Sequence, residues 1–178
     1  IGGGVGIPPM VFLADYITHK ASDWRPLVVM GSEIPFPFTL RPSSILIDGM
    51  ADGAIASMPL LEGWGVPCRL ATLQGYSGCY DGYVTDLARV WLGSLGDDAL
   101  DDVEVFACGP TPMLRAAAQV AAEFGLPCQV SLEEHMACAV GGCAGCTVLV
   151  QTDAGPAMKR VCVDGPVFDA YSVFPPAA

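Results

Sequence analysis

The chain has 178 residues, of which 52% are apolar and only 15% are charged. Its 19 acidic and 8 basic side chains give a formal net charge of −11. Because such a surface repels phosphate groups, we expect no nucleic-acid partner. The sequence contains no run of 18 apolar residues, so we expect no transmembrane helix.

The chain opens on Ile1 and the glycine loop Gly2-Gly3-Gly4-Val5-Gly6. A loop of this kind normally follows a buried strand, and almost nothing of that strand precedes it here. We therefore expect the sequence to be a fragment of a longer protein.

Residues 8–20 are predicted to form a helix, because proline fits the first turn and the apolar residues recur at helical spacing. Further along we predict a buried strand over 26–30, a proline-rich loop or insertion over 34–44, a short strand over 45–47 and a helix over 54–64. The next predicted elements are a strand over 67–73, a glycine-rich loop over 74–82, a helix over 83–92, a strand over 103–107, a helix over 113–124 and a strand over 127–132.

Strands that alternate with helices predict a parallel sheet with helices on both faces, so the predicted fold class is α/β. The pattern changes after residue 132, where cysteines, glycines and short β-like pieces such as residues 147–151 follow. We predict a nucleotide-binding domain over residues 1–132 and a small metal-binding module over residues 133–178.

Half of the eight cysteines lie in this module with the spacing C-x4-C-x2-C-x15-C: Cys138, Cys143, Cys146 and Cys162. Plant-type [2Fe–2S] proteins have the same spacing over their first three ligands. Two bridged irons need four thiolates, and the glycines of the loop permit the left-handed backbone angles that a tight wrap requires. The sequence therefore predicts these cysteines as the ligands of a [2Fe–2S] cluster.

A zinc site is the main alternative for these cysteines. Zinc sites usually use two C-x2-C pairs or include histidine, whereas this module has one such pair and His135 lies outside the loop. A secreted disulfide scaffold would be smaller and would spread its cysteines more evenly. We therefore expect an iron–sulfur cluster and a reducing compartment, the cytoplasm.

Two turns of the α/β domain indicate nucleotide binding. The first is the glycine loop, where close backbone approach and a helix N-terminus suit a pyrophosphate, although Pro9 stands at the third glycine of G-x-G-x-x-G. The second follows the strand over 103–107 and opens a helix. A plain strand-to-helix turn and a small buried cysteine are the alternatives. The residues expected to face the nucleotide are Gly2, Gly3, Gly4, Gly6, Cys108, Gly109 and Pro110.

The motifs GGGVGIPPM, GYVTDLA and CGPTPML resemble the pyridine-nucleotide domain of the ferredoxin–NADP⁺ reductase superfamily. The stretches EEHMACAVGGCAGC and VCVDGPVF are similar to the electron-transfer subunits of NAD-linked (class 1B) dihydroorotate dehydrogenase. Ala139 departs from that pattern, since the family often has glycine after the first cluster cysteine. The proline-rich stretch IPFPFTLRPS is also longer than the minimal fold needs.

The resemblance implies a ferredoxin-reductase type of nucleotide domain with a small C-terminal cluster module. It implies NAD and FAD as cofactors, with FAD held mostly by an N-terminal barrel that this sequence lacks. It also implies a partner, the FMN-containing dihydroorotate dehydrogenase catalytic subunit, in a heterotetramer that serves pyrimidine biosynthesis. Within this scheme the chain relays electrons and carries no catalytic residue for dihydroorotate.

Glu33 follows the second predicted strand, where a carboxylate binds a ribose hydroxyl and disfavours a 2′-phosphate. This position favours NAD over NADP. A solvated loop carboxylate is an equally good interpretation.

Two other functions remain open at this point. One is the NAD(P)H-dependent reductase component of an oxygenase or hydrogenase-type complex, although the short interval before Cys162 leaves little room for a complete plant-type ferredoxin domain. The other is a cluster-binding module that senses redox state and transfers no electrons from a nicotinamide.

Overall fold

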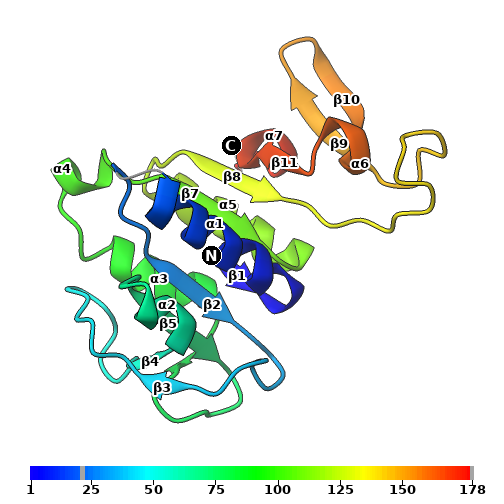
Figure 1. The fold of residues 1–178 in the computed structure, drawn as a ribbon. Coiled ribbons are helices and arrows are strands. Elements are labelled where there is room, and N and C mark those ends of the chain that lie inside the picture. Colours follow the sequence, from blue (N-terminus) through cyan, green and yellow to red (C-terminus); the bar gives the residue numbers. More distant parts are fainter. Residues whose placement is uncertain (21–22, 177–178) are drawn as a thin grey trace.

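The structure is a computed structural model that describes residues 1–20 and 23–176, so the last two residues of the predicted module lie outside the described residues. Its main sheet has seven strands in the order β11-β8-β7-β1-β2-β5-β6 (Figure 1). β11 runs antiparallel to β8, and the other neighbours are parallel. The strands are β1 (Gly2–Gly3), β2 (Val28–Gly31), β5 (Cys68–Thr72), β6 (Tyr80–Asp81), β7 (Val105–Cys108), β8 (Cys128–Ser131) and β11 (Val167–Asp169).

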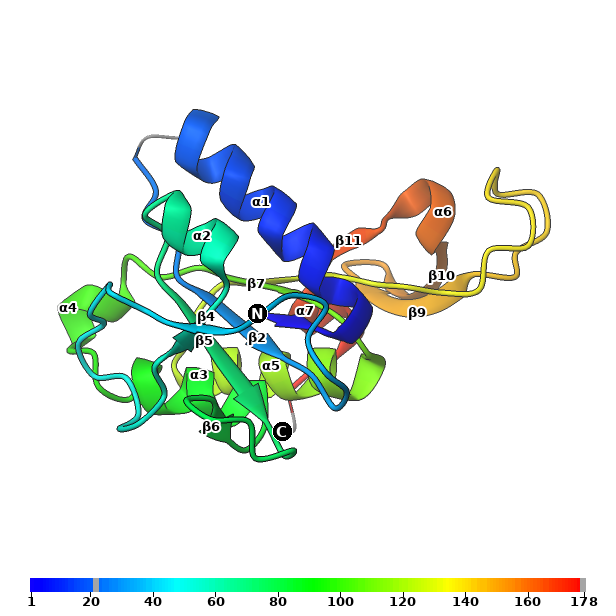
Figure 2. The same cartoon turned by 60° about the horizontal axis from the view of Figure 1, so that its bottom comes forward.

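Helices cover both faces of this sheet, which confirms the predicted α/β class. A short 3-10 turn, η1 (Gly4–Gly6), leads from β1 into α1 (Ile7–Lys20). Figure 2 shows α1 and α2 (Pro59–Gly63) on one face, and α3 (Val84–Leu92) and α5 (Thr111–Glu123) on the other. The small α4 (Asp97–Leu100) lies between α3 and β7 in the chain.

The hydrophobic core follows the alternation of the buried strands. Met30 and Leu70 are fully buried and pack toward α1 and α2, whereas Val29 and Ala71 pack toward α3. Because successive strand side chains point to opposite faces, a strand covered on both sides is apolar throughout. This explains why the sequence shows continuous apolar runs at β2 and β5.

Two predicted elements of the first half are wrong. Residues 45–47 form no strand, because the Ser43 hydroxyl donates to the carbonyl of Ile45 and accepts from its N–H, which favours a turn. A short hairpin of β3 (Arg41–Pro42) and β4 (Ala56–Ser57) lies nearby instead. Residues 54–64 are not one helix, because Met58, before Pro59, is extended and α2 begins only at the proline.

The C-terminal part begins with a two-stranded hairpin of β9 (Thr147–Thr152) and β10 (Gly155–Arg160), which confirms the strand predicted over 147–151. The chain continues through α6 (Val161–Asp164), β11 and α7 (Ala170–Val173). Figure 1 shows the hairpin and the preceding cysteine-containing loop projecting from the body of the molecule.

The C-terminal part returns to the main sheet. In β11, Phe168 lies opposite Val130 of β8. Ala170 and Phe174 join the core cluster under α5, and the Arg115 guanidinium lies 4.8 Å above the Phe174 ring. The two predicted units are thus joined by strand pairing and a shared core.

Among the described residues, every helix is too short or too polar to span a bilayer.

Candidate functional site

The two predicted nucleotide turns lie on neighbouring strands. β1 pairs with β7 through Gly2 and Cys108, so both turns leave the sheet at its carboxyl edge. The close approach explains the glycines: a Cβ atom on Gly6 would overlap the carbonyl group of Cys108, and one on Gly3 would overlap the Met113 sulfur. The structure therefore brings the glycine loop and the Cys108 turn together.

The second turn delivers the start of α5 to the same edge. Gly109 has a φ of +154°, and a Cβ there would lie 2.8 Å from the carbonyl oxygen of Gly3. Pro110 caps the helix without donating an N–H, and α5 begins at Thr111. The N-termini of α1 and α5 thus both face the region beyond Gly3, where their unpaired N–H groups favour an anion.

Glu33 lies two residues beyond the end of β2, whose Gly31 pairs with Gly3 of β1. Its side chain is exposed. The structure therefore puts Glu33 just after the strand next to the glycine loop and at the same edge, which is the position that a ribose-binding carboxylate occupies in dinucleotide folds.

Cys108 is buried beside this edge, and burial raises the pKa of its thiol. The thiol therefore stays protonated at neutral pH and is a poor nucleophile. The structure gives it no role in covalent chemistry.

Three of the four predicted cluster ligands lie on residues 138–146, which we call the cluster loop; Cys162 lies on α6, directly after β10. The loop is tightly wound: Ala139, Gly141 and Ala144 have φ values of 56°, 80° and 55°. Such angles are strained for alanine, and a loop keeps them when close packing requires them. The backbone N–H of Cys143 lies 3.4 Å from the sulfur of Cys138.

Backbone N–H groups point at the sulfur atoms. Hydrogen bonds from the backbone of Val140 and Cys143 lower the pKa of Cys138 to about 6. The backbone of Cys162 lowers the pKa of Cys146 in the same way. Because a thiolate is the form that binds metal, these donors prepare the loop for iron.

Cys162 faces the loop as well. Its thiol donates to Cys146, which raises the pKa of Cys162, while the N–H of Gly141 points at its sulfur and opposes that shift. Nearby negative charge on Cys146 and Cys138 raises it further. Cys162 is thus influenced by Cys146 and Cys138, although 16 positions of chain separate it from Cys146.

Within residues 1–20 and 23–176, no three His, Cys, Asp or Glu side chains are arranged closely enough to hold a metal ion. The donor chemistry nevertheless fits an iron–sulfur group, because backbone N–H groups converge on thiols whose charged forms they stabilise. Cys143 is exposed and Cys138 is half-buried, so inorganic iron and sulfide can reach the loop.

Sequence reasoning missed two residues beside the loop. Arg160, at the end of β10, donates from Nη1 to the carbonyl oxygen of Gly141 at 3.1 Å. Asp164 accepts from both the backbone N–H and Nε of Arg160, at 2.7 and 3.3 Å. The available signal in the sequence was a basic residue two positions before the last predicted ligand and an acidic residue two positions after that ligand.

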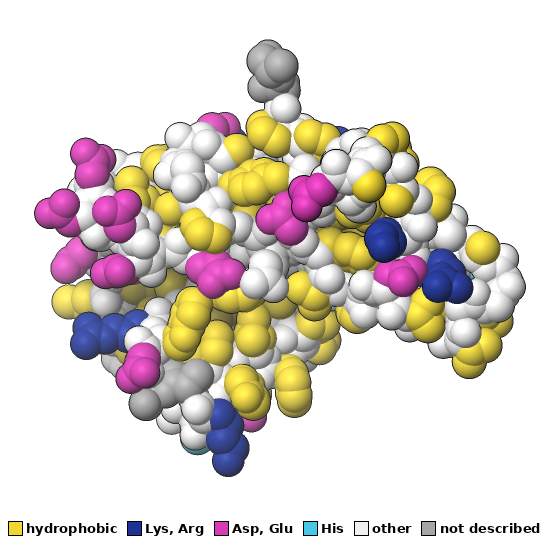
Figure 3. Space-filling view, turned by 90° about the horizontal axis from the view of Figure 1, so that it is seen from above, with side chains coloured by type: hydrophobic (Ala, Val, Ile, Leu, Met, Phe, Trp, Pro, Cys, Tyr) yellow, Lys and Arg dark blue, Asp and Glu magenta, His cyan; other side chains and the backbone are white. Residues whose placement is uncertain are grey.

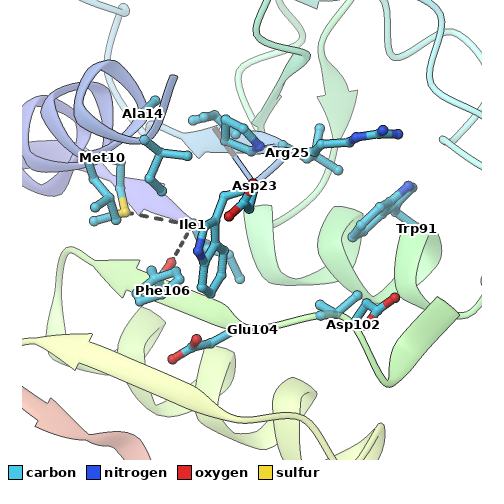
Figure 4. A pocket seen from close by; sticks show the side chains of 16 residues that line it. Ile1, Met10, Ala14, Asp23, Arg25, Trp91, Asp102, Glu104 and Phe106 are labelled. Carbon is cyan, nitrogen blue, oxygen red and sulfur yellow. Dashed lines mark hydrogen bonds between the residues drawn. The ribbon is translucent and has the colours of Figure 1, made fainter. Parts of the chain in front are cut away.

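A cavity of about 580 Å³ opens at the amino edge of the sheet, away from these residues (Figure 4). Figure 4 shows Ile1 beside Phe106, with Trp91 across the opening; the Ile1 amino group donates to the Phe106 carbonyl. None of the predicted nucleotide or cluster residues lines this cavity. Ligands of doubly wound sheets bind beyond the carboxyl ends of the strands, which is the other edge, where the two predicted nucleotide turns lie.

These features define a class of protein: a reductase-type nucleotide fold joined to an iron–sulfur-binding segment. Residues 133–174 match the family described as the iron-sulfur cluster binding domain of dihydroorotate dehydrogenase B. A solved structure reported as "Insights into flavin-based electron bifurcation via the NADH-dependent reduced ferredoxin-NADP oxidoreductase structure" superposes with a TM-score of 0.61 at 27% identity, over 97% of this chain and 51% of that chain.

The sequence comparison identifies the relatives more closely. The chain is 34% identical over 173 residues to the "Dihydroorotate dehydrogenase B (NAD(+)), electron transfer subunit" of Caldanaerobacter subterraneus subsp. tengcongensis, over 97% of this chain and 57% of the relative. It is 31% identical to the subunit of the same name from Shouchella clausii, over 97% of this chain and 55% of that relative. The chain is thus related to these electron-transfer subunits, and it spans a little over half of their length.

Proposed function

We propose that the chain is the nucleotide- and cluster-bearing part of the electron-transfer subunit of an NAD-linked dihydroorotate dehydrogenase. In this proposal NAD binds at the carboxyl edge of the sheet, and a [2Fe–2S] cluster is held by Cys138, Cys143, Cys146 and Cys162. FAD is held mostly by further sequence outside this chain. The partner is an FMN-containing catalytic subunit, in a heterotetramer in the cytoplasm.

One observation carries the proposal more than any other. The segment that carries Cys162 continues into β11 and α7, which join the sheet with the two predicted nucleotide turns, and Cys146 at the end of the cluster loop is buried in the same core. A nicotinamide transfers a hydride, whereas a [2Fe–2S] cluster passes single electrons when bound, so a flavin is needed between them. A chain that carries a nicotinamide site and a cluster loop on one fold suits such a relay.

The residues of this chain bind and position; they have no proton to move. The glycine loop lets the backbone approach the pyrophosphate, and the N-termini of α1 and α5 favour its charge. Gly3, Gly6 and Gly109 leave no room for side chains between the turns. At the other end, the N–H groups of the cluster loop stabilise thiolate charge, which favours the more negative, reduced cluster.

The test uses the full native polypeptide, expressed with its candidate partner and purified anaerobically. We expect about two irons and two sulfides per chain and a [2Fe–2S] electron paramagnetic resonance (EPR) signal after reduction. We also expect an FMN-containing partner to co-purify, and NADH to reduce orotate only in the complex. A colourless protein that holds zinc would contradict the cluster; a normal cluster without any effect of NADH would contradict the electron relay.

A second function is favoured by the structural comparison. The solved structure with a TM-score of 0.61 is reported as an NADH-dependent reduced ferredoxin-NADP oxidoreductase, so the same fold serves a complex with another activity. The identity of the co-purified partner separates the two functions. An FMN protein that oxidises dihydroorotate supports the first, and a partner that reacts with ferredoxin supports the second.

A further inference from the structure

We propose that Arg160 is a positioning residue for the cluster, which holds the cluster loop against the segment that carries Cys162. This inference rests on the proposed function, because it concerns the cluster that the loop is proposed to hold. It concerns a side chain to which neither the motifs nor the comparisons assign a role.

Arg160 contacts the cluster loop directly. Arg160 Nη1 donates to the carbonyl oxygen of Gly141, in the middle of the cluster loop, at 3.1 Å. Gly141 lies between two of the proposed ligands, three positions after Cys138 and two before Cys143. Through its guanidinium, Arg160 therefore joins the middle of the cluster loop to the segment that carries Cys162, two positions further along the chain.

The guanidinium of Arg160 is itself held in place by Asp164. Asp164, on the far side of Cys162, accepts from Arg160 Nε at 3.3 Å and from the Arg160 backbone N–H at 2.7 Å. A rigid fork of donors that is fixed at one end can restrain what it binds at the other. Lysine, a point charge on a flexible stem, cannot hold both partners in this way.

Gly141 is closely enclosed by side chains of the segment that carries Cys162. A Cβ atom there would lie 3.0 Å from Val163 Cγ2 and 3.3 Å from Arg160 Nη1. The positive φ of 80° matches a residue without a side chain. Arg160 and Val163 thus enclose Gly141 from the Cys162 segment, and the loop cannot slide without breaking these contacts.

The positive charge of Arg160 also bears on the proposed cluster. The chain has only 8 basic side chains for 19 acidic ones. Figure 3 shows acidic side chains crowded on the side of the molecule where α4 lies, and two basic side chains with an acidic one between them on the projecting C-terminal arm. A cluster with four thiolates is negatively charged and becomes more so on reduction, so a cation beside it favours the reduced state.

The test compares Arg160→Gln, Arg160→Lys and Lys159→Gln in the full native polypeptide, purified anaerobically. Lys159→Gln is the matched control, because it removes the same charge one position away and Lys159 has no hydrogen bond to the cluster loop among the described residues. The measurements are the rate of iron loss to a chelator, the EPR spectrum of the reduced protein and its midpoint potential. Circular dichroism checks that each variant folds.

We expect Arg160→Gln to lose iron on the order of 10-fold faster than the wild type. Its EPR g-values should shift and its midpoint potential should fall, both by more than in Lys159→Gln. Arg160→Lys should have a midpoint potential close to that of the wild type, because lysine keeps the positive charge. It should still lose iron faster than the wild type, because lysine lacks the rigid guanidinium that binds both partners. A purely structural role elsewhere in the fold would leave the EPR spectrum unchanged.

The outcomes separate this inference from the proposed function. A wild-type protein with a normal cluster, beside an Arg160→Gln variant that matches Lys159→Gln in all three measurements, would contradict the positioning role alone. A wild-type protein that binds no iron would contradict the proposed cluster, and with it the role of Arg160.

Discussion

Gly6 lies against the main chain of Cys108 so closely that a single methyl group does not fit between them. One residue belongs to the turn before α1 and the other to the end of β7, more than 100 positions apart in the chain. The two predicted nucleotide turns are therefore one packed unit, and a change in the first affects the second.

This contact predicts the effect of Gly6→Ala. The added methyl group must push the Cys108 turn away, so we expect a loss of about 3 kcal/mol in the free energy of unfolding and weaker NADH binding. Gly63→Ala is the control, because a Cβ at Gly63 meets nothing within 4 Å and the residue ends a helix. Urea denaturation checks the prediction, and equal stability of the two variants would refute it.

Cys138→Ser tests the cluster ligands. A serine oxygen is a poorer ligand for iron than a thiolate, so we expect iron content to drop and the visible absorption to fade or shift. Cys79→Ser serves as the control, since Cys79 is half-buried outside the cluster loop. Iron analysis and absorption spectra of both variants make the comparison; equal iron loss in both would exclude Cys138 as a special ligand.

Glu33→Gln tests the nucleotide preference. Removing the carboxylate should ease binding of a 2′-phosphate, so we expect the ratio of kcat/KM for NADPH over NADH to rise about tenfold, equivalent to roughly 1.4 kcal/mol. Asp98→Asn in α4 is the control, because it removes one negative charge near the other edge of the sheet. Steady-state kinetics of the complete complex gives both ratios, and an unchanged ratio for Glu33→Gln would remove its proposed role.

Glu62 predicts a pH-dependent contribution to stability. Burial raises its pKa, but hydrogen bonds from Ser44, Ser43 and Ser57 outweigh it and lower the pKa from 4.5 to about 2. The folded pKa is thus the lower one, so the stabilisation is complete above about pH 4.5 and is lost as the pH falls through about 2. Because the carboxylate is partly exposed, solvent screening reduces the expected contribution to about 1–2 kcal/mol.

The measurement is the free energy of unfolding of Glu62→Gln against wild type, by urea denaturation from pH 7 downwards. We expect a deficit of about 1–2 kcal/mol at pH 7 that shrinks below about pH 4. Glu123→Gln, which breaks the exposed Arg89 ion pair, should cost less than about 1 kcal/mol. A deficit of Glu62→Gln that stays constant with pH would show that the serine hydroxyls do not favour the carboxylate.

The regular α/β part of the fold could be predicted from the sequence because its signals are local. The apolar run of β5 and the apolar spacing of α1 each identify an element without knowledge of its neighbours. The wrong predictions lie where hydrogen bonds of individual side chains determine the path of the main chain. Ser43 bends the chain by bonding the main chain of Ile45, and no period in the sequence announces such a contact.

For the candidate site, the sequence identifies the turns but not their packing. The glycine loop and the Cys108 turn are visible as motifs, yet their contact depends on the order of strands in the sheet. Arg160 escaped notice because its partner, Gly141, lies 19 positions earlier across a hairpin. β11 escaped because its three residues, Val167–Asp169, carry too short a pattern to indicate a strand.

That short strand has a mechanical consequence. β11 pairs with the sheet and α7 packs in its core. The projecting C-terminal arm therefore cannot move away from the sheet unless these hydrogen bonds and apolar contacts break together. Any hinge movement of the main α/β body must therefore carry the C-terminal arm along at a fixed separation. The rate of electron tunnelling between redox centres falls off steeply with distance. A stiff connection within the chain would therefore make the rate of electron transfer insensitive to bending of the chain. That rate would then be set by how the chain docks on its neighbours.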